Sequence, residues 1–327
     1  MCGRIRSYSA LAAPLALLVL LLLLPAEAAE GARAGLSVCA GVIVPSLFPF
    51  LVLSGTLSAL HLPEKLAALA APLLRRLDLP SQCAAPLLLG LCGGYPAGAV
   101  AVAELVRSGA LSPEDGTRML PWCNNTGPGF IVAVAGGAVF GSVRIGLLLF
   151  LAHALSALAL ALLIGRQPQS APAPPAASPP AALSDAFSAG VGGALRATLG
   201  VCSYIVFFSV LTALLRGSGL FSALAAAISL RCHTELRFAV ALLTGCLELG
   251  SGVAALRGMA ASPANLALAA FLLGFGGLSV HAQTRFAVSG TKIRCARHFA
   301  GRIVHGLLSA VLLLLLLTAL RRLRIGI

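Results

Sequence analysis

Two short stretches rich in glycine and proline interrupt a chain that is otherwise apolar enough to lie in a bilayer. Residues 90–98 read GLCGGYPAG, and residues 121–129 read PWCNNTGPG. Such residues break helices, and an unwound backbone at membrane depth is tolerated only where protein or a water-filled cavity satisfies its N–H and C=O groups. The two stretches therefore predict broken membrane helices that line a common site.

The composition places these stretches in a membrane protein. Of 327 residues, 59% are hydrophobic and 10% are charged, and the mean hydropathy is +0.98. We expect an all-α, polytopic integral membrane protein of about 8–10 transmembrane helices, in two similar halves with broken or re-entrant segments. The net charge of +13 does not indicate a nucleic-acid partner, because the basic residues are scattered between apolar runs as topology-setting loop charges are.

Four segments are expected along the chain. Residues 1–30 form an N-terminal transmembrane helix or a signal-like segment, since an A-x-A pattern follows the first apolar run. Residues 31–165 form a first membrane repeat, which includes an amphipathic surface helix at about residues 63–79. Residues 166–185 form a linker rich in proline and alanine, and residues 186–327 form a second repeat.

A weak similarity between the halves supports the two repeats. Leu88-Leu-Gly90 matches Leu243-Thr-Gly245, and His153 matches His305 inside the last helix of each half. The offsets are all near 150 residues, roughly half of the chain, which indicates a duplication.

The second half has breaks of its own. Residues 248–252 read ELGSG, and residues 274–281 read GFGGLSVH. Each break creates half-helix ends, and the N–H groups at a helix N-terminus favour anionic ligand groups. We therefore expect a small polar or anionic solute at a site near the membrane midplane.

Four of the candidate residues supply polar groups, and each of them has two open interpretations. Glu248 costs about 2.5 to 3.5 kcal/mol to insert in an apolar span, so it contacts substrate or a coupling ion, or it pairs with an arginine or with backbone amides. Asn124 and Asn125, together with Thr126, bind the solute or satisfy the broken backbone.

Aromatic and imidazole side chains complete the candidate site. His281 binds substrate, carries a proton or makes a structural hydrogen bond, whereas His153 and His305 are best explained by hydrogen bonds between helices. Tyr95 closes over a ligand or packs beside Pro96. The predicted substrate-binding residues are Gly93, Gly94, Tyr95, Gly98, Asn124, Asn125, Thr126, Gly127, Glu248, Ser251, Gly276, Gly277, Ser279 and His281.

Two further groups of residues have simpler interpretations. A basic cluster is expected in a cytoplasmic loop that binds anionic lipid headgroups. It consists of Arg285, Lys292, Arg294, Arg297 and Arg302. Cysteines in apolar stretches are expected to be small buried hydrophobic residues. They are Cys39, Cys92, Cys123, Cys202 and Cys246.

Enzyme signatures are missing from the sequence. It has no Walker A loop, no H-E-x-x-H, no G-x-S-x-G and no zinc-ligand spacing. We expect no catalytic residues, no metal and no cofactor, and transport that is passive or driven by an ion gradient.

Several ordered motifs together resemble the YlbJ family of sporulation integral membrane proteins, in the nucleoside-recognition or Gate-domain group. They are the stretch GGYPAG at residues 93–98, CNNTGP at 123–128, His153, and GFGGLSVH at 274–281. The resemblance extends over about residues 36–320.

The resemblance implies a multi-pass protein of endospore-forming Firmicutes that moves dipicolinic acid across the outer forespore membrane during sporulation. It also implies a lipid bilayer as partner; we add a possible coupling ion, H⁺ or Na⁺, and a possible homo-oligomer. Two alternatives stay open. One is a transporter or sensor of nucleosides, and the other is a membrane scaffold for spore envelope assembly that transports nothing.

Overall fold

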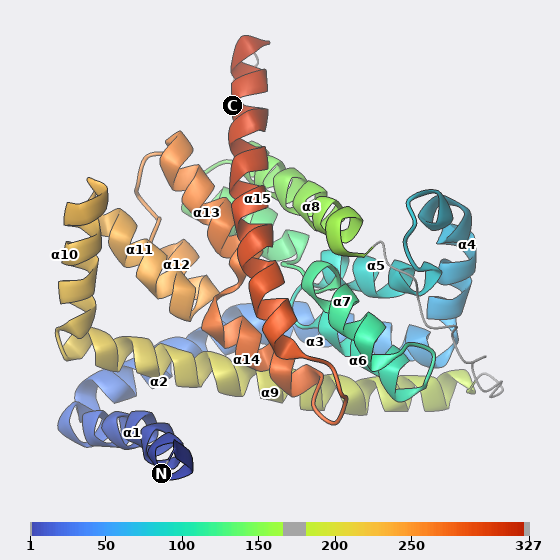
Figure 1. Ribbon diagram of the computed structural model, residues 1–327, viewed down its shortest axis with the longest axis horizontal. Helices are drawn as coiled ribbons and strands as arrows, with labels where there is room; N and C mark the ends of the chain where they lie inside the picture. The colour runs from blue at the N-terminus through green and yellow to red at the C-terminus, as the bar shows by residue number, and fades with distance from the viewer. Residues whose placement is uncertain (1, 166–180, 324–327) are drawn as a thin grey trace.

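The computed structural model describes residues 2–165 and 181–323, and within these ranges every regular element is a helix (Figure 1). This finding confirms the all-α class. Most of the predicted linker, residues 166–180, lies outside the described residues.

The first half contains eleven helical elements in the described residues. They are α1 (Cys2–Leu23), α2 (Pro25–Val38), the π-helix η1 (Cys39–Ile43), α3 (Val44–Ala59), α4 (Leu62–Arg76), the 3₁₀-helix η2 (Ser81–Cys83), α5 (Ala84–Gly93), α6 (Ala97–Arg107), α7 (Pro113–Cys123), the π-helix η3 (Gly129–Val139) and α8 (Val143–Ile164). The helix α4 agrees with the amphipathic helix expected at residues 63–79. The helix α7 begins at Pro113 because Ser112 caps it by accepting a hydrogen bond from the Asp115 N–H at 3.1 Å.

The second half repeats the order of the first from α3 onward. It contains α9 (Leu183–Gly217), α10 (Leu220–Cys232), α11 (Leu236–Leu247), α12 (Leu249–Ala254), α13 (Pro263–Phe275), α14 (Gly277–Ala287) and α15 (Cys295–Arg322). In each half two helices, α3 and α4 or α9 and α10, are followed by two broken pairs and a long last helix, with the short η2 inserted in the first half. This order agrees with two repeats, although the duplication itself stays a prediction.

Fewer helical segments than the 8–10 expected from sequence are long and apolar enough to cross a membrane in the described residues. By length and composition, four spans in the described residues qualify, and a fifth qualifies if α1 and α2, which meet at 102°, count as one bent span. The four are α8, α9, residues 263–287 and α15. The difference arises because breaks divide residues 84–107 and 236–254 into helices of 6 to 12 residues, which are too short to span a bilayer.

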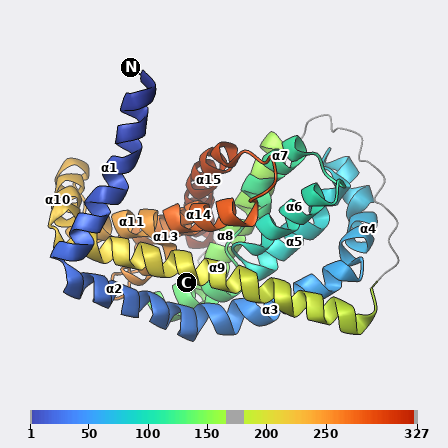
Figure 2. The same cartoon turned by 90° about the horizontal axis from the view of Figure 1, so that it is seen from below.

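The long helix α9 joins the two halves. It lies lengthwise beside α2 and α3, as Figures 1 and 2 both show. Gly31 and Gly35 of α2 allow the approach, since a Cβ on either glycine would lie 2.8 Å from a valine Cα of α9, Val210 or Val206. Small residues spaced by four bring helix backbones together in membranes. The predicted repeats therefore pack against each other along their length.

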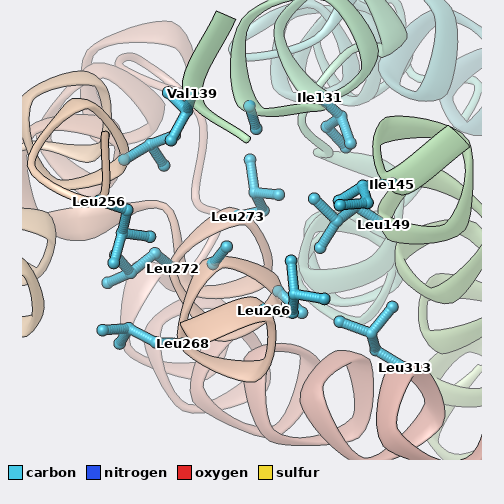
Figure 3. Packing of buried hydrophobic residues seen from close by; sticks show 14 of the residues in the cluster. Ile131, Val139, Ile145, Leu149, Leu256, Leu266, Leu268, Leu272, Leu273 and Leu313 are labelled. Atoms are coloured by element: carbon cyan, nitrogen blue, oxygen red, sulfur yellow. The ribbon is translucent and has the colours of Figure 1, made fainter. Parts of the chain in front are cut away.

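The largest group of buried aliphatic side chains surrounds α13 (Figure 3). Leu272 and Leu273 of α13 pack with Ile131 of η3, Leu149 of α8 and Leu313 of α15. This packing holds the broken helices of both halves against the two last helices, α8 and α15.

One of the five cysteine predictions is wrong. Cys39 and Cys123 are buried and Cys202 and Cys246 are half-buried, whereas Cys92 is exposed. Cys92 is the second-last residue of α5.

Candidate functional site

The first break separates α5 from α6 at Gly93, Gly94, Tyr95 and Pro96. Gly94 has φ of +77°, a conformation that residues with a Cβ rarely adopt. A Cβ on Gly94 would also lie 2.8 Å from the backbone nitrogen of Gly127, and one on Gly98 would overlap the Cys123 carbonyl oxygen. Glycine at these positions thus lets the first break lie backbone to backbone against the second.

The second break separates α7 from η3, and its polar residues are buried. Asn124 accepts a hydrogen bond from the Ala99 N–H of α6 at 3.3 Å and donates one to Thr284 Oγ1 of α14 at 2.9 Å. Asn125 donates to the Trp122 carbonyl oxygen at 2.9 Å. These contacts agree with the interpretation that the amides satisfy the broken backbone, and solute binding by them stays a prediction.

The third break separates α13 from α14 at Gly276 and Gly277, whose φ angles are +89° and +76°. The Leu273 carbonyl oxygen, near the end of α13, accepts hydrogen bonds from Thr126 Oγ1 at 2.8 Å and from the Tyr95 hydroxyl at 3.3 Å. Side chains of the first and second breaks therefore donate hydrogen bonds to a carbonyl oxygen near the end of α13.

The fourth break separates α11 from α12 at Glu248, whose side chain is 6% exposed. Its carboxylate accepts hydrogen bonds from the N–H groups of Gly250 at 2.8 Å and Ser251 at 2.6 Å. An anion at a helix N-terminus is stabilised by the helix dipole. Of the interpretations left open, pairing with backbone amides is observed, and contact with substrate or an ion stays a prediction.

All four breaks lie next to one another. Gly94 faces Gly127, Tyr95 and Thr126 reach Leu273, and a Cβ on Gly277 would lie 3.3 Å from the Leu249 nitrogen at the fourth break. The structure thus brings together the segments that carry most of the predicted site residues.

The remaining predicted residues lie on α14. Ser279 accepts a hydrogen bond from Gln283 Nε2 at 3.1 Å. His281 Nδ1 lies 3.3 Å from His298 Nδ1 of α15, and its ring lies against the rings of Phe275 and Phe299. Sequence reasoning did not single out His298.

Arg302 is the main correction to the sequence prediction. It was expected in a lipid-facing loop, yet it lies inside α15 with no exposed surface. Its guanidinium donates to the Pro121 carbonyl oxygen at 3.1 Å, to Asn125 Oδ1 at 3.3 Å, to the Tyr95 hydroxyl and to His305 Nδ1. Arg297, five residues earlier, is exposed as expected.

A helical pattern around Arg302 could have revealed its burial. The buried residues of this part of α15 recur every three or four positions, as one face of a helix requires. They are His298, Gly301, Arg302, His305, Gly306 and Ser309.

A cavity of about 390 Å³ lies beside the first break. Helices α3, α5, α6 and α9 line it, mostly with small residues such as Gly55, Ala101 and Gly190. Ala97, the first residue of α6, also lines it, together with Glu104 and Arg196. The break at Tyr95 and Pro96 is therefore one residue away from a cavity that contains a charge of each sign.

The fold and the converging breaks define a polytopic all-α integral membrane protein with interrupted helices. The chain is similar to the sporulation integral membrane protein YlbJ of Bacillus subtilis (strain 168), with 28% identity over 320 residues that cover 89% of this chain and 78% of that protein. This homology supports the YlbJ family and so confirms the resemblance found in the motifs. No protein-family model and no solved structure matches the chain.

Proposed function

We propose that this protein transports a small polar or anionic solute across a membrane, and that the solute is dipicolinic acid, carried across the outer forespore membrane during sporulation. The observation that carries the proposal is the meeting of four interrupted helices, linked by the contacts of Gly94 with Gly127 and of Tyr95 and Thr126 with Leu273. Discontinuous helices that meet inside a membrane protein are a recurring way of building solute and ion sites.

The chemistry of the helix ends at the breaks favours an anionic solute. The helices α6 and α14 both begin at a break, and the N-terminus of a helix carries partial positive charge. At α6 the Ala99 N–H already donates to Asn124. Dipicolinic acid is a small aromatic dicarboxylate, so its two carboxylates suit the partial positive charge at these helix ends. The similar protein of Bacillus subtilis is a sporulation integral membrane protein, which supports the proposed setting.

The proposal includes no enzymatic activity and no nucleotide-driven step. An ion gradient of H⁺ or Na⁺ drives any uphill movement, and Glu248 is the acidic side chain at the breaks that could take part in the coupling. A homo-oligomer is compatible with this scheme.

The experiment is a flux measurement with purified protein in liposomes at several pH values. It compares wild type with Glu248→Gln and with the double variant Asn124→Ala/Asn125→Ala. The matched control is Glu235→Gln, because Glu235 is also an N-cap residue, at α11, but is exposed and makes no cap hydrogen bond. Dipicolinate flux above that of empty liposomes, reduced in the first two variants and unchanged in the control, is the expected result.

The other outcomes identify the alternatives. Flux of labelled uridine without flux of dipicolinate would replace the proposal by nucleoside transport. Folded, inserted protein that moves neither solute at any pH would contradict transport and favour a scaffold.

A further inference from the structure

The interior contains a cation with no carboxylate beside it. Arg302 is fully buried, and in the described part of the chain no aspartate or glutamate forms an ion pair with it. At the fourth break, the carboxylate of Glu248 is already held by the amides of Gly250 and Ser251. A buried charge is costly unless it is paired, so the position calls for an anion.

One edge of the Arg302 guanidinium has an N–H group without a hydrogen-bond partner among the described residues. Nη1 is directed to three acceptors, Pro121 O, Asn125 Oδ1 and His305 Nδ1. Nη2 has the Tyr95 hydroxyl as its partner, and the buried Nε–H has none within the described ranges. Nε and Nη2 form the side of the guanidinium that binds a carboxylate through two parallel N–H groups.

The surroundings of Arg302 add donors and no negative charge. His305 lies one turn away on α15, and the ring of His153 lies 4.5 Å from that of His305. On the preceding turn His298 faces His281. His281 and His298 each have a buried Nε2 without a partner among the described residues. Because the two Nδ1 atoms share one hydrogen bond, one of the two neutral rings carries its proton on Nε2, and that N–H can donate to an anion. A neutral imidazole does not compete with the anion as a carboxylate would.

We propose that Arg302 binds a carboxylate group of the transported solute through its Nε–H and Nη2–H, and that this carboxylate displaces the Tyr95 hydroxyl from Nη2. The inference rests on the proposed function and adds the residue that recognises the charge.

The displacement links binding to the helix breaks. Tyr95 lies in the first break, and its hydroxyl joins Arg302 to the Leu273 carbonyl oxygen of α13. When a carboxylate takes the place of that hydroxyl, Tyr95 loses its contact with α15 while Thr126 still holds Leu273. Binding therefore releases the first break from the last helix of the second half.

The test measures equilibrium binding in lipid nanodiscs and flux in liposomes for wild type, Arg302→Lys, Arg302→Gln and Tyr95→Phe. The probes are dipicolinate and its neutral analogue pyridine-2,6-dicarboxamide. The matched control is Arg297→Gln, which removes an exposed arginine from the same helix. Thermal unfolding of each variant establishes that it is folded.

We expect Arg302→Gln to raise the Kd for dipicolinate on the order of 10- to 100-fold, as the loss of hydrogen bonds to a charged group does, and to leave binding of the neutral analogue nearly unchanged. Arg302→Lys keeps the charge but loses the planar pair of donors, so it has a smaller effect of the same sign. Tyr95→Phe removes the competing hydroxyl and lowers the Kd. If Arg302→Gln does not fold, the Kd values of Arg302→Lys and Tyr95→Phe test the inference.

Two results would overturn the inference in distinguishable ways. In the first case wild type carries dipicolinate, but a folded Arg302 variant binds it with the wild-type Kd, or Tyr95→Phe weakens binding as Arg302→Lys does. The proposed function then stands, and the Arg302 site is wrong. If wild type neither binds nor carries dipicolinate, the proposed function fails and the site fails with it.

Discussion

The imidazole rings of His153 and His305 lie with their centres 4.5 Å apart, although 152 residues separate them in the sequence. His305 Nε2 lies 3.0 Å from the His153 carbonyl oxygen, and His153 Nε2 accepts a hydrogen bond from the Thr126 N–H at 3.2 Å. Through His153, these contacts join the last helix of each half to the second break. It agrees with the interpretation of these histidines as hydrogen-bonding residues between helices.

We expect the two histidines to stabilise the fold as a pair. A double-mutant cycle of His153→Ala and His305→Ala should give a coupling free energy of about 0.5 to 1.5 kcal/mol, because the contact between the two rings is lost when either ring is removed. Unfolding in mixed detergent micelles measures it. A cycle of His153→Ala with His233→Ala, an exposed histidine, is the control. Additive effects in the first cycle would contradict the pair.

Thr126→Val should destabilise the protein by about 1 to 3 kcal/mol, because it removes the hydroxyl that donates to the buried Leu273 carbonyl oxygen at 2.8 Å. Thr318→Val is the control, since Thr318 donates to a carbonyl oxygen at the same distance but is exposed. The free energy of unfolding of the two variants is compared. Equal losses would show that the third break does not depend on Thr126.

Gly274→Ala should cost about 1 to 3 kcal/mol of stability through overpacking, since a Cβ on Gly274 would lie 2.5 Å from the Gly306 Cα, where α13 crosses α15. Gly193→Ala in α9 has no atom within 4 Å of the added Cβ. It should be neutral or stabilise by about 0.5 to 1 kcal/mol as alanine does in a helix. The difference in melting temperature between the two variants checks the crossing, and a neutral Gly274→Ala would refute it.

Cysteine accessibility should follow the structure and not the hydropathy of the surrounding sequence. In single-cysteine variants, Cys92 and Cys232 are expected to react with a membrane-permeant maleimide, because both are exposed. Cys83 and Cys123 have no exposed surface, so they should react only after unfolding in denaturing detergent. Mass spectrometry of the labelled protein distinguishes the cases. Labelling of Cys123 in the folded protein would place the second break elsewhere.

The sequence by itself determined the class of protein and the positions where its helices break. Apolar runs must be helical in a bilayer because each backbone group needs a partner. Gly94, Pro96 and Gly277 lie at these breaks, where glycine readily adopts positive φ and proline lacks the N–H that a helix needs. The same local logic located Glu248 as a buried carboxylate, although not the Gly250 and Ser251 amides that hold it.

Only the tertiary structure decided which residues meet. Arg302 and Arg297 stand in the same basic stretch, yet one faces Tyr95 and Asn125 in the interior and the other is exposed. The face of a helix that becomes buried is set by the helices packed against it, and these come from distant parts of the chain. For the same reason the number of continuous spans, the pairing of His281 with His298 and the adjacency of the four breaks became apparent only in the folded protein.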